Sequence, residues 1–334
     1  MSRPRVYVTR HLPGGALDYL SRDCDVGLWP GELPPPPDEL RRAAADSDGM
    51  ITLLTDRVDE TVLAGAGRLL VISNMATGFD NIDVPAATRQ GVLVTRTPGV
   101  LSETTADFAF ALLLAAARRV PEGDRYVRDG RWRTWGPEIL LGHDVHGASL
   151  GIVGMGGTGQ EMAKRARGFG MRVVYNSRTP RPVLERRYKM TFVPLDDLLR
   201  DSDFVTLHAP LTPETRGLIG ERQLRMMKST SVLVNTARGP LVDQAALYRA
   251  LNEGWIAAAA IDVTDPEPIL PEDLLLKLDN LVIAPHIASA SVATRSRMAM
   301  LAAEQLVQAL RGEVPANVVN REALRRWRRR VSSV

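Results

Sequence analysis

The chain has a single cysteine, Cys24, among its 334 residues. One cysteine excludes an intrachain disulfide and any metal site built from clustered cysteines. Long hydrophobic runs are also missing, since the longest, residues 108–117, falls far short of the roughly 20 residues that cross a bilayer. Residues 1–10 contain no apolar core of a signal peptide. We therefore expect a cytoplasmic protein with no membrane span and no bound metal.

An excess of positive charge is confined to the C-terminal end. The net charge is +3, but residues 321–334 hold six Arg and one Glu, a net +5, so the other residues sum to −2. No nucleic-acid-binding motif accompanies these arginines. We expect residues 321–330 to form a helix whose basic face is solvated, although an acidic partner is an alternative. Only this tail suggests disorder.

Length and patterning predict two α/β domains. The chain exceeds the usual size of a single hydrophobic core, and its apolar content of 45% is ordinary for a globular protein. Short β-like runs alternate with helical segments, which is typical of doubly wound parallel sheets. The expected strands are residues 6–9, 50–54, 69–75, 92–95, 150–155, 171–175, 204–208, 231–236, 257–263 and 281–284.

Two long helices suggest how the domains are connected. One is expected over residues 102–120, before a glycine-rich turn, and the other over residues 291–311, after the last strand. If the last helix returns to the first domain, the cofactor domain is an insertion. We then expect residues 100–287 to form a dinucleotide-binding domain, and residues 1–99 with 288–334 to form the substrate-binding domain.

The glycine-rich turn is the clearest ligand-binding motif. Gly154, Gly156 and Gly159 follow one predicted strand and open a predicted helix, with Gly157 and Thr158 between them. In such a βαβ unit the first glycine allows the tight turn, the second lets the backbone approach a pyrophosphate, and the third lets helix and strand pack closely. The free N–H groups of the helix then face the anion.

The residues after the second strand of this unit indicate the cofactor. A site for NAD usually carries an acid there, about 20 residues beyond the glycines, to hold the ribose 2′-hydroxyl. This chain has Ser177, Arg178 and Thr179 instead, which suit a 2′-phosphate through hydroxyl donors and a guanidinium. We therefore expect NADP, with NAD possible. Alternatively, Arg178 stacks on adenine or lies in solvent.

Three polar residues at predicted strand ends could act on a 2-oxo acid. Arg238 could grip a carboxylate with its guanidinium, His286 could donate a proton to the ketone oxygen, and Glu267 could favour the protonated imidazole. Carboxyl ends of strands are where ligands bind in open α/β sheets. Separately, each could be a structural or surface residue.

Several motifs in order resemble the D-isomer-specific 2-hydroxyacid dehydrogenases. They are NMATGFDNID (74–83), TPGVLSETTAD (97–107), the glycine turn, LHAP (207–210), NTARG (235–239), DVTDPEP (262–268) and PHIASA (285–290). The resemblance covers about residues 51–316 and is most similar to glyoxylate/hydroxypyruvate reductases.

The resemblance implies a site and an assembly. Arg238, Glu267 and His286 would be catalytic, the backbone N–H groups of Thr77 and Gly78 would hold the substrate carboxylate, and dimers would form largely through the cofactor domain. The other expected substrate contacts are Leu53, Ser289 and, from the partner subunit, Trp135. The other expected cofactor contacts are His208, Pro210, Thr215, Thr236, Ala237, Asp262 at the nicotinamide carboxamide, and Ala288.

The chain departs from the family at one cofactor position. Gly157 and Thr158 stand where the family usually has Arg-Ile, which should weaken pyrophosphate binding while keeping the backbone cradle. No Lys occurs between Asn74 and Asp83, which argues against the phosphite-oxidising relatives.

Rival functions stay open at this point. Phosphoglycerate dehydrogenase is disfavoured because no regulatory domain follows residue 334, whereas 2-ketogluconate reductase is not excluded. A dinucleotide-sensing binding protein, like the family's corepressors, would keep the same Arg, Glu and His. Our expectation is an NADP(H)-preferring reductase of glyoxylate and hydroxypyruvate.

Overall fold

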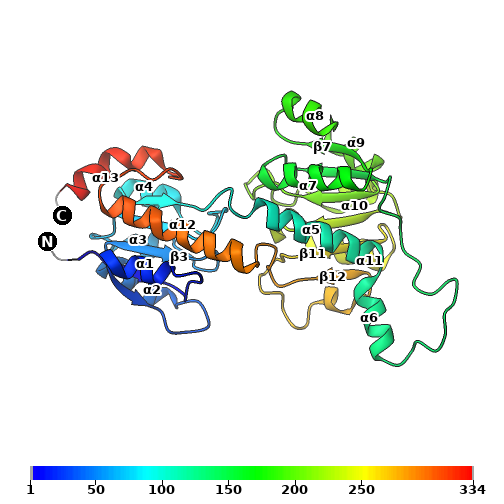
Figure 1. Cartoon of the computed structure of the whole chain (residues 1–334), viewed down its shortest axis with the longest axis horizontal. Coiled ribbons are helices and arrows are strands. Elements are labelled where there is room, and N and C mark those ends of the chain that lie inside the picture. The colour runs from blue at the N-terminus through cyan, green and yellow to red at the C-terminus, as the bar shows by residue number, and fades with distance from the viewer. Residues whose placement is uncertain (1–2, 333–334) are drawn as a thin grey trace. The chain divides into compact units, whose positions relative to one another are not determined.

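The computed structural model describes residues 3–332, which divide into two compact units. The first unit ends at Leu101 and resumes at Ala290, and the second unit is Ser102–Ser289. Each boundary lies two residues beyond the predicted one. Figure 1 labels the elements of both units.

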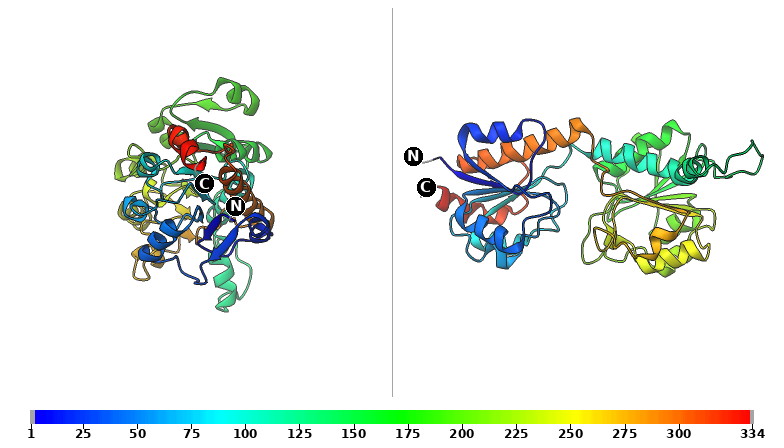
Figure 2. Two further views of the ribbon diagram at one scale, coloured as in Figure 1. Left: turned by 90° about the vertical axis from the view of Figure 1, so that its left-hand side faces the viewer. Right: turned by 90° about the horizontal axis from the view of Figure 1, so that it is seen from below.

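A parallel sheet with the strand order β2-β1-β3-β4-β5 forms the centre of the first unit. Its central strands β3 and β4 are buried along their whole length, as expected where helices cover both faces of a sheet. Figure 2 shows helices on both sides of this sheet. The strands are β1 (Arg5–Val8), β2 (Asp25–Leu28), β3 (Gly49–Thr52), β4 (Val71–Asn74) and β5 (Leu93–Thr95).

Two sets of helices form the two hydrophobic layers of this unit. Helices α1 (Ala16–Asp23) and α12 (Val292–Leu310) contribute to one buried cluster. The other cluster takes side chains from α2 (Pro37–Asp46), α3 (Glu60–Leu63) and α4 (Val84–Gln90). Because α12 packs against α1, β3 and β4, the chain does return to the first unit after the last strand of the second.

A second parallel sheet, in the order β12-β11-β10-β9-β6-β7-β8, forms the centre of the second unit. The strand order reverses between β6 and β9, which is the topological switch point where ligands bind in such sheets. Its strands are β6 (Ser149–Val153), β7 (Arg172–Asn176), β8 (Thr191–Phe192), β9 (Phe204–Leu207), β10 (Val232–Asn235), β11 (Ala258–Ile261) and β12 (Leu281–Ile283).

The helices of the second unit also form two layers. One buried cluster takes residues from α5 (Ser102–Ala117) and α7 (Gly157–Gly168), and the other from α9, α10 and α11. The remaining helices are α6 (Val120–Arg128), α8 (Pro182–Tyr188), α9 (Leu195–Asp201), α10 (Glu221–Met226) and α11 (Gln244–Asn252), with short 3₁₀ turns at Gly239–Leu241 and Leu274–Lys277.

The predicted fold class, two parallel-sheet α/β domains, is confirmed. The edge strands β2 and β8 are absent from the predicted set. Strand β2 is mostly exposed and contains Gly27, and β8 is only two residues long, so neither has the apolar run that marks a strand in the sequence.

The single helix predicted over residues 102–120 is wrong at its end. Helix α5 stops at Ala117, and α6 starts at Val120. Between them, Arg119 adopts a left-handed backbone with φ 54°, and Pro121 occupies the first turn of α6, where proline is favoured. The break falls at Arg118 and Arg119, directly after the apolar run 108–117, and arginine is itself a good helix former, so the local sequence does not indicate the break.

The expectation of a solvated, disordered tail is also wrong for the residues described. A 3₁₀ turn (Arg321–Ala323) leads into α13 (Leu324–Val331), and Trp327 is fully buried in the first unit. Arg326 donates to the carbonyl of Arg89, and Arg330 donates to those of Gln90 and Gly67. The arginines therefore bind C-terminal carbonyls of α4 in addition to facing solvent, and burial of one large aromatic stabilises the unit by roughly 3 kcal/mol.

The described residues contain neither a membrane-spanning helix nor a cluster of metal-binding side chains. Across residues 3–332, no helix combines the length and the apolar character that a membrane span requires. Nor does this part of the chain contain a group of three or more His, Cys, Asp or Glu side chains arranged around a potential metal ion.

Candidate active site

The glycine turn has the geometry of a pyrophosphate cradle. Gly154 follows β6 with φ 99°, and a Cβ there would lie 2.6 Å from the backbone of His208. A Cβ on Gly159 would lie 2.1 Å from the carbonyl oxygen of Gly154, so the close packing of helix and strand also requires glycine. A Cβ on Gly156 would meet no atom within 4 Å. The first and third glycines are thus fixed by the fold, whereas the second faces open space at the start of α7.

The side chain of Ser102 leaves little space for any side chain at residue 157. A Cβ at this position would lie 2.5 Å from the hydroxyl oxygen of Ser102, the first residue of α5. A larger side chain at residue 157, such as the family's arginine, would therefore have to displace Ser102. Thr158 follows within the first turn of α7, and no side chain caps this helix.

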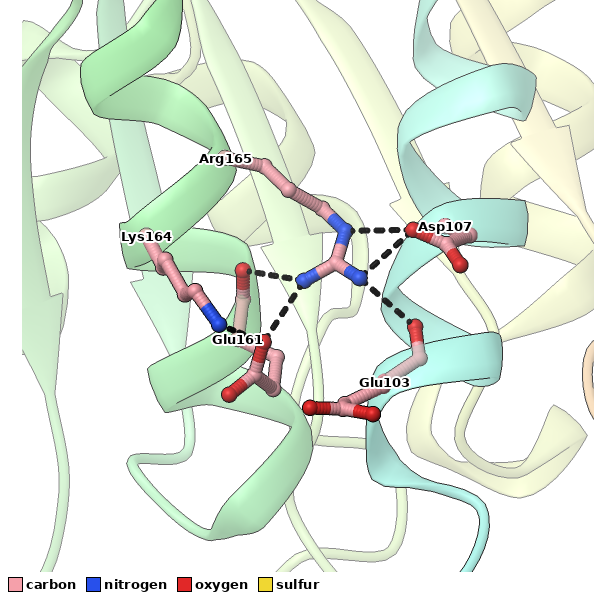
Figure 3. Close-up of polar contacts among 5 residues, drawn as sticks. All are labelled: Glu103, Asp107, Glu161, Lys164 and Arg165. Atoms are coloured by element: carbon pink, nitrogen blue, oxygen red, sulfur yellow. Dashed lines mark hydrogen bonds and ion pairs between the residues drawn. The ribbon is translucent and has the colours of Figure 1, made fainter.

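An ion-pair network holds the helix that carries this turn. Arg165 on α7 donates to the carboxylate of Asp107 on α5 at 2.8 and 2.5 Å, and to the carbonyl of Glu103 at 3.0 Å. It also binds the carboxylate of Glu161, one turn earlier on α7, at 2.8 Å. Figure 3 shows the guanidinium between the two helices, with Lys164 on the far side of Glu161. Because Arg165 is largely shielded from water, this network fixes α7 against α5.

The residues after β7 lie at the surface. Ser177 donates its hydroxyl to the carbonyl oxygen of Thr179 at 2.8 Å, and Arg178 is exposed. A hydrogen bond from Thr212, the backbone of Glu214 itself and the charge of Arg178 lower the pKa of Glu214. An acidic side chain from the loop after β9 is therefore within electrostatic range of Arg178, which the local sequence does not indicate.

Hydrogen bonds within the loop after β9 hold its shape. The hydroxyl of Thr215 donates to the carbonyl of Pro210 at 2.7 Å and accepts from the N–H of Thr212 at 2.8 Å. His208 shares a hydrogen bond of 2.9 Å between its Nε2 and Thr206 Oγ1, and burial lowers the pKa of His208 to about 3. Burial therefore favours the neutral form of His208, whose backbone lies beside Gly154, and its expected contact with the cofactor stays a prediction.

Arg238 lies on a turn that Asn235 shapes. The Asn235 amide donates to the carbonyl of Arg238 at 2.8 Å and accepts from the N–H of Ala237 at 3.0 Å, which fixes residues 236–238 at the end of β10. The half-buried Arg238 also donates to the carbonyl of Ala237 at 2.8 Å. A Cβ on Gly239 would lie 2.0 Å from the carbonyl oxygen of Thr264, so this turn touches the one that leads to Glu267.

His286 and Glu267 form a direct pair. The distance between His286 Nδ1 and Glu267 Oε1 is 2.5 Å, and both side chains are about three-quarters buried. His286 follows β12 and Glu267 follows β11, so adjacent parallel strands bring them together. Within this unit, the structure thus places the predicted proton donor against the predicted carboxylate.

Asp262 holds the turn on which His286 sits. Its carboxylate accepts the N–H groups of Ile287 and Ala288, each at 2.8 Å, and its carbonyl accepts the N–H of His286 at 2.9 Å. These bonds support the left-handed backbone of His286, whose φ is 56°. Burial raises the pKa of Asp262, which is 1% exposed, while the two backbone bonds oppose that shift. The expected carboxamide contact stays a prediction.

In the first unit, two peptide groups next to Thr77 have a fixed orientation. The carbonyl of Ala76 accepts from the N–H of Thr97 at 2.9 Å, and the carbonyl of Thr77 accepts from Arg96 at 3.3 Å. In a trans peptide the N–H points opposite to the C=O, so the N–H groups of Thr77 and Gly78 point away from Arg96 and Thr97. No acceptor for either N–H occurs among residues 3–332. Two such donors can bind a carboxylate.

Three other residues are predicted to contact the substrate. Leu53 follows β3 and donates its N–H to the carboxylate of Asp56 at 2.7 Å. Ser289 is the last residue of the second unit and is partly buried. Trp135 is 78% exposed, on a segment after α6. The structure does not test their contact with a substrate, and these assignments stay predictions.

Sequence reasoning missed several residues that shape the site. They act through neighbouring residues, and the motifs that contain some of them do not by themselves indicate these contacts. They are Arg96 and Thr97 behind the Thr77 turn, Ser102 beside Gly157, Glu214 near Arg178, and the pair Asn74 and Asn81.

Comparisons with known proteins agree with this geometry. The family model for the NAD binding domain of D-isomer specific 2-hydroxyacid dehydrogenases matches residues 110–288. A glyoxylate reductase of Korarchaeum cryptofilum is 53% identical over 324 residues, covering 97% of this chain and 98% of that protein. A glyoxylate reductase of Aeropyrum pernix is 51% identical over 329 residues, covering 97% and 98%.

A solved structure adds a bound cofactor. It is an NADPH-dependent glyoxylate/hydroxypyruvate reductase of Sinorhizobium meliloti in complex with NADP and malonate. It is 31% identical to this chain, covers 96% of this chain and 98% of its own, and has a TM-score of 0.86. Together with the NAD binding domain match, this supports a nicotinamide dinucleotide as the cofactor.

The cradle yields a prediction that separates binding from folding. Gly156→Ala adds a methyl group where the protein leaves open space, so the melting temperature should stay unchanged. The same methyl group would obstruct the phosphates, so the dissociation constant for NADPH should rise roughly tenfold or more, measured by fluorescence titration. Gly168→Ala, also in open space but at the other end of α7, is the control and should bind normally. Equal affinity in both variants would show that phosphates do not approach Gly156.

Proposed function

This chain belongs to the D-isomer-specific 2-hydroxyacid dehydrogenase family, and from that premise we propose that it reduces glyoxylate to glycolate and hydroxypyruvate to D-glycerate. We further propose that NADPH is its preferred reductant. The observation that carries the proposal is the His286–Glu267 pair beside the Arg238 turn, in a unit that also holds the glycine cradle. The cytoplasm is the proposed location.

The proposed chemistry divides between three side chains. When bound, the dinucleotide supplies a hydride from nicotinamide C4 to the 2-oxo carbon. His286 donates a proton to the carbonyl oxygen, so that the C=O becomes a CH–OH group. With Nδ1 held by Glu267, Nε2 is the nitrogen that would exchange this proton. Arg238 would bind the substrate carboxylate and carbonyl oxygen, which places positive charge where negative charge develops.

The proposed preference for NADPH depends on the residues that follow β7. No carboxylate follows that strand directly, and the exposed Arg178 with Ser177 and Thr179 could bind a 2′-phosphate. Glu214 opposes this by attracting Arg178. A phosphate with nearly two negative charges competes better for the guanidinium than a single exposed carboxylate, which supports NADPH.

We propose that a second copy of the chain covers the segment around α6. Large apolar side chains are exposed there, more than a solvated surface usually gathers in one place. The segment borders a pocket of about 330 Å³ lined in part by Ala116, Arg119 and Leu141. A monomeric mass in light scattering would contradict this dimer. The exposed side chains are Val120, Val127, Trp132, Trp135, Ile139 and Leu141.

Initial rates test the function directly. The purified protein should reduce glyoxylate and hydroxypyruvate faster than 2-ketogluconate or pyruvate, and faster with NADPH than with NADH. Arg178→Ala should raise the KM for NADPH strongly and leave the KM for NADH nearly unchanged, because only the phosphate uses the guanidinium. Arg186→Ala, exposed on α8, is the control. Dinucleotide binding without turnover of any substrate would favour a sensor protein instead.

Removal of one charge tests the role of Glu267. Glu267 lies 2.5 Å from Nδ1 of His286, and Glu267→Gln keeps a hydrogen bond to the ring but removes the negative charge. Because the carboxylate orients the ring for proton transfer, reductive kcat with saturating cofactor should fall roughly tenfold or more in the variant. Glu272→Gln, which changes an exposed glutamate a few residues away, should keep the wild-type kcat. An unchanged kcat in Glu267→Gln would remove Glu267 from the mechanism.

A further inference from the structure

A partly buried polar network in the first unit links the two turns expected to meet the substrate. One turn is residues 53–56, after β3, and the other is residues 77–78, after β4. Asn81 contacts the first turn directly, because its amide donates to the carbonyls of Leu53 and Asp56, both at 3.0 Å. Its backbone is fixed as well, since its carbonyl accepts the N–H of Val58 at 2.9 Å.

Asn74 carries the link to the second turn. Its amide nitrogen donates to the side-chain oxygen of Asn81 at 3.1 Å and to the carbonyl of Gly78 at 3.0 Å. Its side-chain oxygen accepts from Thr52 at 3.0 Å. Asn74 and Thr52 have no exposed surface, so water cannot substitute for these bonds.

The first turn is fixed from its other side by a buried carboxylate. Asp56 accepts the N–H of Leu53 at 2.7 Å and the hydroxyl of Thr9 at 2.5 Å, and it is 1% exposed. Asp56 and Asn81 therefore hold this turn from two sides, since Asp56 binds the N–H of Leu53 and Asn81 binds the carbonyls of Leu53 and Asp56. The pairing of β3 with β4 sets the coarse distance between the two turns, and the Asn81–Asn74 contact adds a second link beyond the strand ends.

We infer that Asn81 is a positioning residue for substrate binding, which acts through Asn74 to hold the carboxylate-binding amides in register with Leu53. This inference rests on the proposed function, since it assigns the substrate carboxylate to Thr77 and Gly78. A serine or threonine at residue 81 is too short to reach both carbonyls. A carboxamide supplies two donors and an acceptor at once, which the three contacts require.

The variant Asn81→Ala tests the inference. It should raise the KM for glyoxylate roughly tenfold or more, because small displacements of binding groups are costly. The dissociation constant for NADPH should stay unchanged, because the glycine cradle lies in the other unit. Asn81→Ser, which keeps one hydroxyl, should lie between Ala and wild type and provides a second variant if Asn81→Ala does not fold.

Asn320→Ala is the matched control. Asn320 is a buried amide of the same unit, and like Asn81 it makes three hydrogen bonds through its side chain, here to Val94, Thr88 and Val92, away from both turns. It should lower the melting temperature as Asn81→Ala does, yet leave the KM for glyoxylate unchanged. An equal rise of KM in both variants would reduce the role of Asn81 to general stability and overturn the inference.

Binding of oxalate separates this inference from the proposed function. Oxalate presents a carboxylate but cannot be reduced, so calorimetry with NADP⁺ present reports on the turns without turnover. If the wild type binds oxalate but does not reduce glyoxylate, weaker binding in Asn81→Ala still supports the inference while the proposed function fails. Equal oxalate affinity in Asn81→Ala and wild type, or no oxalate binding by the wild type, would overturn it.

Discussion

The common direction of the strands in each parallel sheet determines where the candidate functional residues lie. Because every strand of a unit runs in the same direction, all carboxyl ends lie on one edge, and the main candidate residues follow such ends. In the second unit these are Gly154 after β6, Arg238 after β10 and His286 after β12. Strand pairing sets their order along this edge, so residues more than 130 positions apart in the chain lie on the same edge of the sheet.

Strand ends bring residues close, but hydrogen bonds to backbone groups orient them. Asp262 fixes the turn of His286 through two N–H groups, and Asn235 fixes the turn of Arg238 through one N–H and one carbonyl. Asn74 and Asn81 do the same in the first unit. In each case a short polar side chain, which is buried or partly buried, satisfies main-chain groups that a turn leaves unpaired. The turns that carry Arg238 and His286 are thus held by neighbouring side chains, those of Asn235 and Asp262.

Motif residues were predictable from the sequence because their chemistry depends on local spacing. Glycine is required at residues 154 and 159 by the turn between one strand and the next helix, which the local sequence indicates. The fold class follows from the alternating apolar runs. Residues that act across the fold were not predictable. Ser102 meets Gly157 only once α5 and α7 pack together, and Trp327 is buried only because α13 folds back onto the first unit. The arginines around that tryptophan looked like a solvated tail, since charge dominates the local composition.

The departure at Gly157 shifts the cofactor site toward the backbone. With Ser102 occupying the space of a side chain at residue 157, positive charge is absent from the turn itself, and under the proposed function the main-chain N–H groups at the start of α7 would bind the pyrophosphate. Those groups do not distinguish one dinucleotide from another. Discrimination would then depend on the far end of the cofactor, where we propose that Arg178 attracts a phosphate and the negative charge of Glu214 opposes this attraction. On this proposal, cofactor choice is a balance between two exposed charges, and salt should weaken that choice more than it weakens binding at the glycine turn.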